Sequence, residues 1–407
     1  MKLDTQFVRA QFPAFSEPSL KKVAHFENAG GSYACGQVID RLTRFYRERK
    51  IQPYGPSEAS RKGGAEMDEA RARLSAMLGV GEDELHFGPS TTANTYTLSQ
   101  AFREALSPGH AIIVTNQDHE ANSGPWRRLE MEGIEIREWK MDPETGHLDP
   151  RDLAHLLDEK VRLVCFPHCS NVIGEINDVA RICAIAHEAG AVTCVDGVSY
   201  APHGLPDVRA LGADIYLFST YKTYGPHQGV MTMRRDLAET LPEQGHYFNA
   251  GYLTKRFTPA GPDHAQIAAC AGIADYIDAL DAHHGGGTGT PLERSARVHD
   301  LMRKREIKLL KPLLKYLRQR NDIRLLGPRR AEGRAPTVAI ETGRPARELA
   351  EALATHGIAA DGGDFYAVRA LEASGVDMAH GVLRMSFVHY TRRKEVDRLI
   401  HALDHIL

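Results

Sequence analysis

Lys222 is the residue whose type and position are most suited to covalent chemistry. It lies in the segment Ser219-Thr220-Tyr221-Lys222-Thr223-Tyr224-Gly225-Pro226, directly after the apolar run 215–218. If this run is a parallel strand, the lysine follows its carboxyl end, where α/β proteins bind ligands. A desolvated lysine amine has a lowered pKa and can form a Schiff base. The simpler alternative is a solvated surface charge, because most lysines are exposed.

Asp196 is the carboxylate expected to lie closest to this lysine. It ends the preceding predicted strand, and Gly212 to Asp214 leads into the strand that carries Lys222. Adjacent parallel strands would bring Asp196 and Lys222 to the same rim. Pyridoxal phosphate (PLP) requires such a pair, since a lysine binds its aldehyde and a carboxylate keeps its pyridine nitrogen protonated. Without Lys222, a turn residue or helix N-cap would be the favoured explanation of Asp196.

Two more segments could complete a cofactor site. Residues 88–94, Gly-Pro-Ser-Thr-Thr-Ala-Asn, offer hydroxyls and backbone amides before a helical segment, and helix N-termini bind phosphate. Taken alone, this motif is explained by an ordinary Ser/Thr cap. His119 follows the apolar run 111–115 and could stack on a cofactor ring, although a lone loop histidine would mean little.

A parallel sheet is needed to position these groups. Between about Glu84 and Arg235, short apolar runs alternate with segments of helical period, which predicts strands joined by crossover helices. Segment 177–189 has apolar residues at helical spacing and ends before Gly190, so it predicts one such helix. The strands are expected at 111–115, 163–167, 191–195, 215–219 and 230–233, all continuously apolar because both faces of the sheet are covered.

The composition favours a protein that acts on a small soluble substrate. The chain has 407 residues, 50 Lys+Arg against 53 Asp+Glu and a net charge of -3, so no basic field would attract nucleic acid or an anionic membrane. No apolar leader or membrane span is evident, and we expect a cytoplasmic protein. The six cysteines lie in apolar segments and are expected to be buried thiols, including Cys165 and Cys169, whose spacing alone does not indicate a metal site.

In combination, these motifs resemble the class V aminotransferases of PLP fold type I, and within them the cysteine desulfurases and selenocysteine lyases. The resemblance runs from Phe26-Glu27-Asn28-Ala29 to the C-terminal helix. It implies an α/β large domain with a mainly parallel, seven-stranded sheet and a smaller α+β C-terminal domain. After Gly285, the basic amphipathic segment 291–321 begins a second domain. We therefore predict an N-terminal segment, 1–20, packing with the small domain, a large PLP-binding domain, 21–285, and a small domain, 286–407.

The resemblance also implies roles for individual residues. Lys222 would bind the PLP aldehyde, Asp196 the pyridine nitrogen, and His119 would stack on the ring; these three form the predicted catalytic set. Arg384, in Leu383-Arg384-Met385-Ser386-Phe387, would bind the substrate carboxylate, for which its bidentate geometry is suited. A surface salt bridge is the alternative for Arg384. The remaining predicted contacts are Thr91, Thr92 and Ser219 to phosphate, Ser199 and Tyr221 to cofactor, Asn171 to cofactor and substrate, and Asn28 and Phe365 to substrate.

Several positions depart from the family pattern. The segment corresponding to the desulfurase cysteine loop, 361–367, contains no cysteine, and none follows Cys270. Ser199 replaces a frequent glutamine, and Tyr221 replaces the histidine that commonly precedes the lysine. The threonine by which a partner subunit contacts the phosphate is missing near Ala260-Gly261-Pro262. We still expect a homodimer with active sites at its interface, because the family is built that way.

The predicted activity is PLP-dependent chemistry on a small amino acid. Without the loop cysteine, we favour β-elimination of a sulfur-containing amino acid, with transamination as the nearest alternative and racemisation or epimerisation as another. Specificity is expected to depend on Phe365, Tyr366, Tyr33 and Tyr54. A PLP-binding protein without catalysis is a weaker hypothesis. A nucleotide-binding domain is weaker still, because neither a G-x-G-x-x-G motif opening a helix nor a P-loop motif is present.

Overall fold

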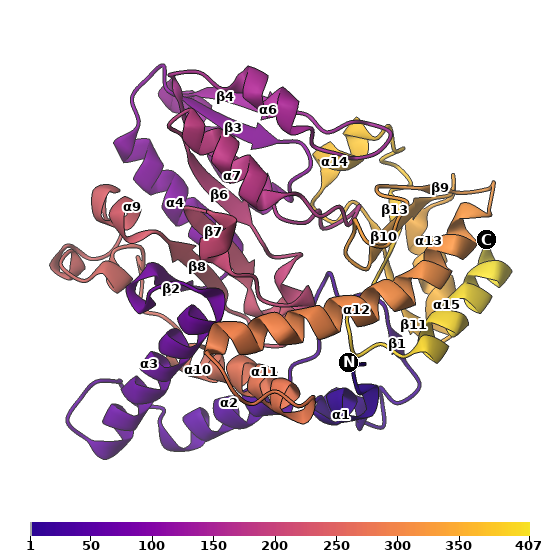
Figure 1. Ribbon diagram of the computed structural model, residues 1–407, viewed down its shortest axis with the longest axis horizontal. Helices are drawn as coiled ribbons and strands as arrows, with labels where there is room; N and C mark the ends of the chain where they lie inside the picture. The colour runs from indigo at the N-terminus through magenta and orange to yellow at the C-terminus, as the bar shows by residue number, and fades with distance from the viewer. Residues whose placement is uncertain (1) are drawn as a thin grey trace.

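A seven-stranded sheet forms the centre of the larger part of the molecule, shown in Figure 1 as a computed structural model that describes residues 2–407. The strand order is β2-β8-β7-β6-β5-β3-β4. The strands are β2 (Leu85–Gly88), β3 (Ala111–Thr115), β4 (Glu135–Trp139), β5 (Val161–Pro167), β6 (Val192–Asp196), β7 (Ile215–Ser219) and β8 (Gly229–Met233). The predicted strand positions are therefore confirmed to within a few residues.

The direction of β8 differs from the sequence-based expectation. The pairs β3-β4, β3-β5, β5-β6 and β6-β7 are parallel, whereas β8 runs antiparallel to both β7 and β2. Only nine residues, 220–228, join β7 to β8. A parallel connection requires a crossover of a dozen or more residues, so this short loop returns the chain antiparallel. The sheet as a whole is mainly parallel, as predicted.

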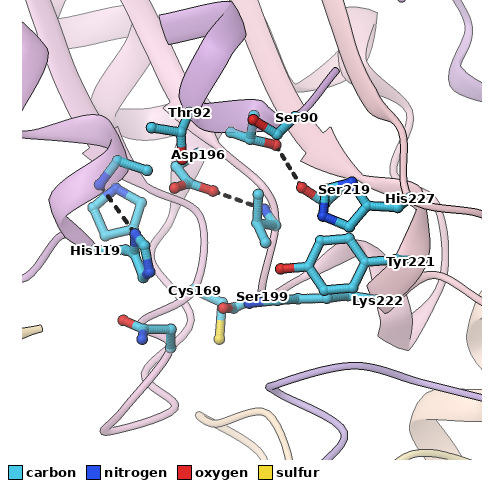
Figure 2. A pocket seen from close by; sticks show the side chains of 15 residues that line it. Ser90, Thr92, His119, Cys169, Asp196, Ser199, Ser219, Tyr221, Lys222 and His227 are labelled. Atoms are coloured by element: carbon cyan, nitrogen blue, oxygen red, sulfur yellow. Dashed lines mark hydrogen bonds between the residues drawn. The ribbon is translucent and has the colours of Figure 1, made fainter. Parts of the chain in front are cut away.

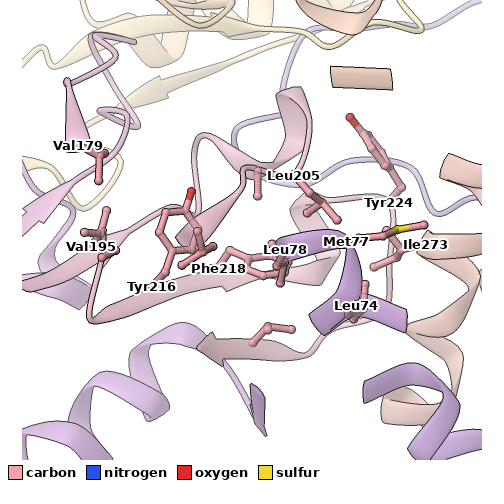
Figure 3. Packing of buried hydrophobic residues seen from close by; sticks show 14 of the residues in the cluster. Leu74, Met77, Leu78, Val179, Val195, Leu205, Tyr216, Phe218, Tyr224 and Ile273 are labelled. Carbon is pink, nitrogen blue, oxygen red and sulfur yellow. The ribbon is translucent and has the colours of Figure 1, made fainter. Parts of the chain in front are cut away.

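Both faces of the sheet are covered, which explains the continuous apolar runs. Ile215 and Leu217 of β7 pack in a cluster with residues of α4, whereas Tyr216 and Phe218 face the opposite side, together with residues of α3, α7 and α11. Figure 3 shows part of this second cluster. The helices around the sheet are α4 (Thr91–Ala105), α5 (Gly124–Arg127), α6 (Pro150–Leu156), α7 (Val179–Glu188), α8 (Val208–Leu211) and α9 (Arg235–Thr240), with α2 (Gly36–Glu48), α3 (Glu58–Leu78), α10 (His264–Ala269) and α11 (Ala271–His283) packed beside it.

The long helix α12 (Pro291–Arg318) connects the two parts of the molecule, as Figure 1 shows. Its N-terminus has a capping box formed by Thr290 and Glu293, which satisfies backbone amides that the helix leaves free. Val298 and Met302 pack in the core of the large part, while the leucines from 309 to 317 pack in the core of the small part. One continuous helix therefore belongs to both cores.

The C-terminal part contains a four-stranded antiparallel sheet of order β12-β13-β10-β9. Its strands are β9 (Arg324–Leu325), β10 (Thr337–Glu341), β12 (Asp361–Gly363) and β13 (Val382–Ser386), and its helices are α13 (Ala346–Thr355), α14 (Val368–Ala373) and α15 (Arg393–Ile406). A further pair joins β1 (Ala24–His25) to β11 (Ile358–Ala359) in parallel. Backbone hydrogen bonds of this pair attach β1 to the C-terminal part.

The N-terminal segment contacts both parts. In α1 (Thr5–Ala10), Phe7 stacks on His283 of α11 with ring centroids 3.7 Å apart, and Arg9 forms an ion pair of 3.1 Å with Glu395 of α15. Residue 1 of this predicted segment lies outside the described residues. Short 3₁₀ helices occur at Pro13–Phe15, Glu82–Glu84, Glu120–Asn122, Arg128–Glu132, Ala201–His203, Thr220–Lys222, Tyr247–Asn249 and Leu253–Lys255. Within residues 2–407, no helix is both long and apolar enough to cross a membrane.

Candidate active site

The carboxyl ends of the central parallel strands border a cavity of about 290 Å³. Its lining contains nine of the predicted site residues: Thr91, Thr92, His119, Asn171, Asp196, Ser199, Ser219, Tyr221 and Lys222. They come from five separate segments of the chain, and Figure 2 shows several of their side chains converging on one space. Sheet topology thus brings together groups that the sequence separates by more than a hundred positions.

Lys222 ends the 3₁₀ turn after β7 and is buried, with 7% of its surface exposed. Burial is the largest cause that lowers the pKa of its amine to about 8, and the positive charge of Arg384 acts in the same direction. The negative charge of Asp196 raises the pKa of this amine and so partly opposes both effects. A lowered pKa makes the neutral, nucleophilic amine accessible near neutral pH, as Schiff-base chemistry requires.

Asp196 is the last residue of β6, and its carboxylate accepts a hydrogen bond of 2.8 Å from the Val198 amide. Burial raises the pKa of this carboxyl to about 6, while the Val198 bond and the charge of Lys222 act against the shift. A buried carboxylate with only one backbone donor is incompletely compensated. It is therefore suited to pair with a cationic group that enters the cavity.

Hydroxyls and a helix N-terminus also line the cavity. Ser90 caps α4 by accepting a hydrogen bond of 3.1 Å from the Ala93 amide, and the hydroxyls of Thr91 and Ser219 are 2.8 Å apart. Gly229 of β8 permits this approach, because a Cβ atom there would lie 2.5 Å from the carbonyl carbon of Ser90. Hydroxyls beside a helix N-terminus form a favourable phosphate site.

His119 lies after β3, and its Nδ1 accepts a hydrogen bond of 3.0 Å from the Ala121 amide. Burial lowers the pKa of the imidazole to about 3, and the charges of Lys222 and Arg384 lower it further. The ring is consequently neutral in the physiological range. A neutral, flat ring on the cavity wall is suited to stacking rather than to ionic binding.

Arg384 of β13 is buried and does not line this cavity. Its Nη2 donates to Oε1 of Glu27 at 2.5 Å, and its Nη1 donates to the Asn171 carbonyl at 3.1 Å. The ring of Phe365 covers the guanidinium, with its centroid 3.8 Å from Cζ. The predicted carboxylate-binding group is thus paired with a carboxylate from the protein itself.

A loop from the C-terminal part closes this side of the site. Phe365 and Tyr366 both have left-handed backbone angles, with φ of 55° and 56°, which are unfavourable for bulky side chains. Hydrogen bonds hold the loop against the large part: the Asn171 side-chain amide donates to the Phe365 carbonyl at 2.9 Å, and the Glu120 amide donates to the Tyr366 carbonyl at 2.8 Å. Arg369 and Glu120 add an ion pair of 3.0 Å.

Asn28 lies behind the lysine rather than in the main cavity. It lines a small space with Ser199 and Lys222, and its side-chain amide donates to the carbonyls of His25 and Ser386, each at 3.3 Å. Its side-chain oxygen accepts a hydrogen bond from the Tyr390 hydroxyl. The structure therefore gives Asn28 protein partners on both ends of its amide.

Two aromatic residues expected to set specificity lie away from the cavity in this chain. Tyr33 stacks on His25, with ring centroids 4.6 Å apart, and Tyr54 is exposed and donates a hydrogen bond of 2.8 Å to Asp68. Conversely, three residues at the site, Glu27, Cys169 and His227, were not predicted from the sequence. Glu27 lies inside the quoted motif 26–29, which was a usable signal, whereas nothing in the local sequence marks the other two.

The six cysteines are free and buried, as predicted. Cys169 is the one that lines the cavity, and its thiol donates to the Gly174 carbonyl with a separation of 3.5 Å. Burial raises the pKa of this thiol to about 12. Within residues 2–407, no group of three or more His, Cys, Asp or Glu residues is arranged to bind a metal.

The donor set of the cavity fits PLP. A buried lysine with a lowered pKa, an incompletely compensated carboxylate and a hydroxyl-lined helix N-terminus match the aldehyde, the pyridine nitrogen and the phosphate, respectively. Asn171 offers a further acceptor, because its buried Oδ1 has no hydrogen-bond partner among the described residues.

Comparison with known proteins gives matches over the whole chain. A family model described as Aminotransferase class-V matches residues 24–283 and 292–399. The aminotransferase-like protein FGM3 of Gibberella zeae is 34% identical over 98% of both chains, and a cysteine desulfurase of Pectobacterium carotovorum is 29% identical over 100% of this chain and 98% of its own. Among solved structures, the cysteine desulfurase CsdA of Escherichia coli superposes with a TM-score of 0.82 and that of Thermococcus onnurineus with 0.85, each 23% identical and covering 100% of this chain and 98% of its own.

Proposed function

Because this chain belongs to the aminotransferase class-V family and is a PLP-dependent enzyme of fold type I, we propose that it catalyses β-elimination from a small sulfur-containing amino acid. The family, the fold class and the cofactor agree with the expectations from sequence. The reaction type and the substrate are the new part of the proposal.

The burial and protonation of the cysteine thiols support elimination rather than transfer of sulfur to the protein. All six cysteines are buried, and the one lining the cavity, Cys169, has a thiol pKa of about 12. A thiolate is the form that attacks sulfur, and such a thiol is almost fully protonated at neutral pH. With no cysteine in segment 361–367, sulfur would leave the enzyme as a free product.

In the proposed reaction, Lys222, Asp196 and the hydroxyls of Thr91 and Ser219 would hold PLP, which would supply an electron sink for the charge that develops at the substrate Cα. The neutral Lys222 amine would accept the Cα proton at Nζ. The Cβ–S electron pair leaves with sulfur, and water then releases the keto acid and ammonia. Asp196 would keep the pyridine nitrogen protonated, and the neutral ring of His119 would stack on the cofactor.

Arg384 is proposed to bind the substrate carboxylate, with Asn171 beside it. Its burial and its contact with the Asn171 carbonyl fix the guanidinium at the edge of the site. A carboxylate held there would set which bond of Cα stands perpendicular to the ring. Phe365, which covers the guanidinium, would contact the same substrate.

Transamination is the second candidate, favoured by the relative at 34% identity, whose name is that of an aminotransferase-like protein. The two reactions share every group named above until the Cα proton has left. They differ in whether a leaving group departs from Cβ or a proton returns to the cofactor.

The deciding experiment incubates purified, PLP-loaded protein with L-cysteine, S-alkylcysteines and L-alanine, with and without an acceptor keto acid. Keto acid formed from the sulfur substrates without acceptor, with equimolar ammonia, supports elimination. Strict dependence on the acceptor indicates transamination instead, and loss of optical rotation without keto acid indicates racemisation. Lys222→Ala should abolish all three reactions.

We also propose that the enzyme is a homodimer in the cytoplasm. The six free thiols suit a reducing compartment. The segment Ala260-Gly261-Pro262, proposed to approach the partner's phosphate site, lies in a loop where Ala260 and Gly261 are exposed. Sedimentation of the purified protein tests the dimer.

A further inference from the structure

The phosphate end of the cofactor site has a charge requirement that its predicted contacts do not meet. The phosphate of PLP carries close to two negative charges, whereas Thr91, Thr92 and Ser219 are neutral. The N-terminus of α4 supplies about half a positive charge at most. The partner threonine expected near residue 261 would add only another neutral hydroxyl, and it is missing from this chain.

Three groups lining the cavity can carry a positive charge: Lys222, His119 and His227. Lys222 binds the aldehyde, at the other end of the cofactor. His119 is neutral, because burial lowers its pKa to about 3. His227 is therefore the remaining group of the three whose ring nitrogens can donate a hydrogen bond to an anion.

The position of His227 suits this requirement. It lies in the short loop between β7 and β8, directly before Gln228, whose side chain donates to the Gly88 carbonyl at the base of the phosphate wall. Its ring stacks face to face on Tyr221, with centroids 4.8 Å apart and planes 7° apart. Figure 2 shows the imidazole above the tyrosine ring and beside Ser219.

The stacking also gives Tyr221 a function. Tyr221 replaces the histidine that commonly precedes the lysine in this family. The tyrosine ring forms a flat support for His227, which lines the same cavity as Thr91 and Ser219. The imidazole is exposed in this chain and takes part in no ion pair within residues 2–407, so its ring nitrogens are available to a ligand.

We propose that His227 is a cofactor-binding residue that donates a charge-assisted hydrogen bond to the PLP phosphate, with Tyr221 as its support. The ligand class is a phosphate monoester dianion at the N-terminus of α4. Binding of the aldehyde by Lys222 and of the pyridine by Asp196 does not depend on this contact.

The test compares PLP with pyridoxal, which has the same ring and aldehyde but no phosphate. Dissociation constants of both ligands are measured by visible absorbance with the apoprotein of the full chain. In His227→Gln, the constant for PLP should rise at least about tenfold, as expected for loss of a charge-assisted hydrogen bond, while that for pyridoxal changes less than about twofold. His227→Lys should recover most of the PLP affinity, because a lysine ammonium also donates hydrogen bonds to an anion.

His401→Gln, an exposed histidine on α15, serves as the matched control and should leave both constants unchanged. Inorganic phosphate provides a second measurement, since it should compete with PLP less effectively in His227→Gln than in the wild type. Unchanged PLP affinity in His227→Gln would overturn the proposal. An equal loss for PLP and pyridoxal would also overturn it, because the residue would then act on the fold of the loop.

Discussion

Arg384 and Glu27 form an ion pair in which Nη2 and Oε1 are 2.5 Å apart, although 357 positions separate them in the chain. The Arg384 side chain is 4% exposed and that of Glu27 is 23% exposed. The guanidinium proposed to bind a substrate carboxylate is thus neutralised by the protein. An incoming carboxylate must displace Glu27 or bind beside it, so Glu27 opposes substrate binding.

Replacing Glu27 should therefore strengthen the binding of anionic substrates. In Glu27→Gln, the side chain keeps its size and can still accept a hydrogen bond from Arg384, but the competing charge is gone. We expect KM for an amino-acid substrate to fall about fivefold to tenfold, equivalent to roughly 1 kcal/mol, with little change in kcat. Steady-state kinetics with whichever of the tested amino acids is turned over provides the measurement.

Asp361→Asn is a suitable comparison, because Asp361 lies close enough to raise the pKa of Arg384 but forms its own ion pair with Arg347 at 2.8 Å. Its effect on KM should be smaller than that of Glu27→Gln. A rise of KM in Glu27→Gln would show instead that Glu27 positions Arg384 for the substrate.

Schiff-base formation by Lys222 should depend on pH with a midpoint near 8. The neutral amine is the nucleophile, so the rate at which apoprotein combines with pyridoxal should rise as pH passes through the pKa of about 8 and level off above it. Stopped-flow absorbance between pH 6 and 10 would measure this profile. Arg384→Gln should move the midpoint upward, because the like charge that lowers the lysine pKa is removed. A wild-type midpoint near 10.5 would contradict the burial of Lys222.

Asp196 should reduce the stability of the apoprotein at neutral pH. Its pKa in the folded state, about 6, exceeds the value of 3.8 expected when unfolded, so the folded state binds the proton more tightly. The stability due to this group is therefore present below about pH 4 and is lost as pH rises through 6. The loss is at most about 3 kcal/mol.

Asp196→Asn should consequently unfold at a higher temperature than the wild type at pH 7.5, with little difference at pH 3.5, when both are free of PLP. Addition of PLP should stabilise the wild type more than the variant, because the pyridinium compensates the carboxylate. Asp40→Asn, an exposed position on α2, should show neither effect. Equal melting temperatures of wild type and Asp196→Asn at pH 7.5 would argue against the raised pKa.

Cys169 should be dispensable for the reaction, although it lines the cavity. Its thiol is protonated and donates a hydrogen bond to the Gly174 carbonyl, so it is a poor nucleophile. We expect Cys169→Ala to keep kcat within about twofold, with a modest loss of stability from the deleted sulfur. Cys183→Ala removes a buried thiol that does not line the cavity and controls for that loss. Mass spectrometry that detects a persulfide on Cys169 during turnover would refute β-elimination as the only route.

The sequence by itself determined the strands and the residues that follow them. Segments 111–115 and 215–219 coincide with β3 and β7, because continuous apolar runs are local consequences of a sheet covered on both faces. The proximity of Lys222 and Asp196 follows from the same pattern, since both residues lie at the carboxyl ends of adjacent strands.

Only the tertiary structure decided the contacts between distant segments. The reversal of β8, the pairing of β1 with β11, the Glu27–Arg384 ion pair and the place of His227 on the phosphate wall leave no periodic signal in the chain. Tyr33 and Tyr54, which were expected to set substrate specificity, lie away from the cavity. Hydrophobic periodicity reports which face of an element is buried, but it does not report which other segment packs against that face or where a loop directs its side chains.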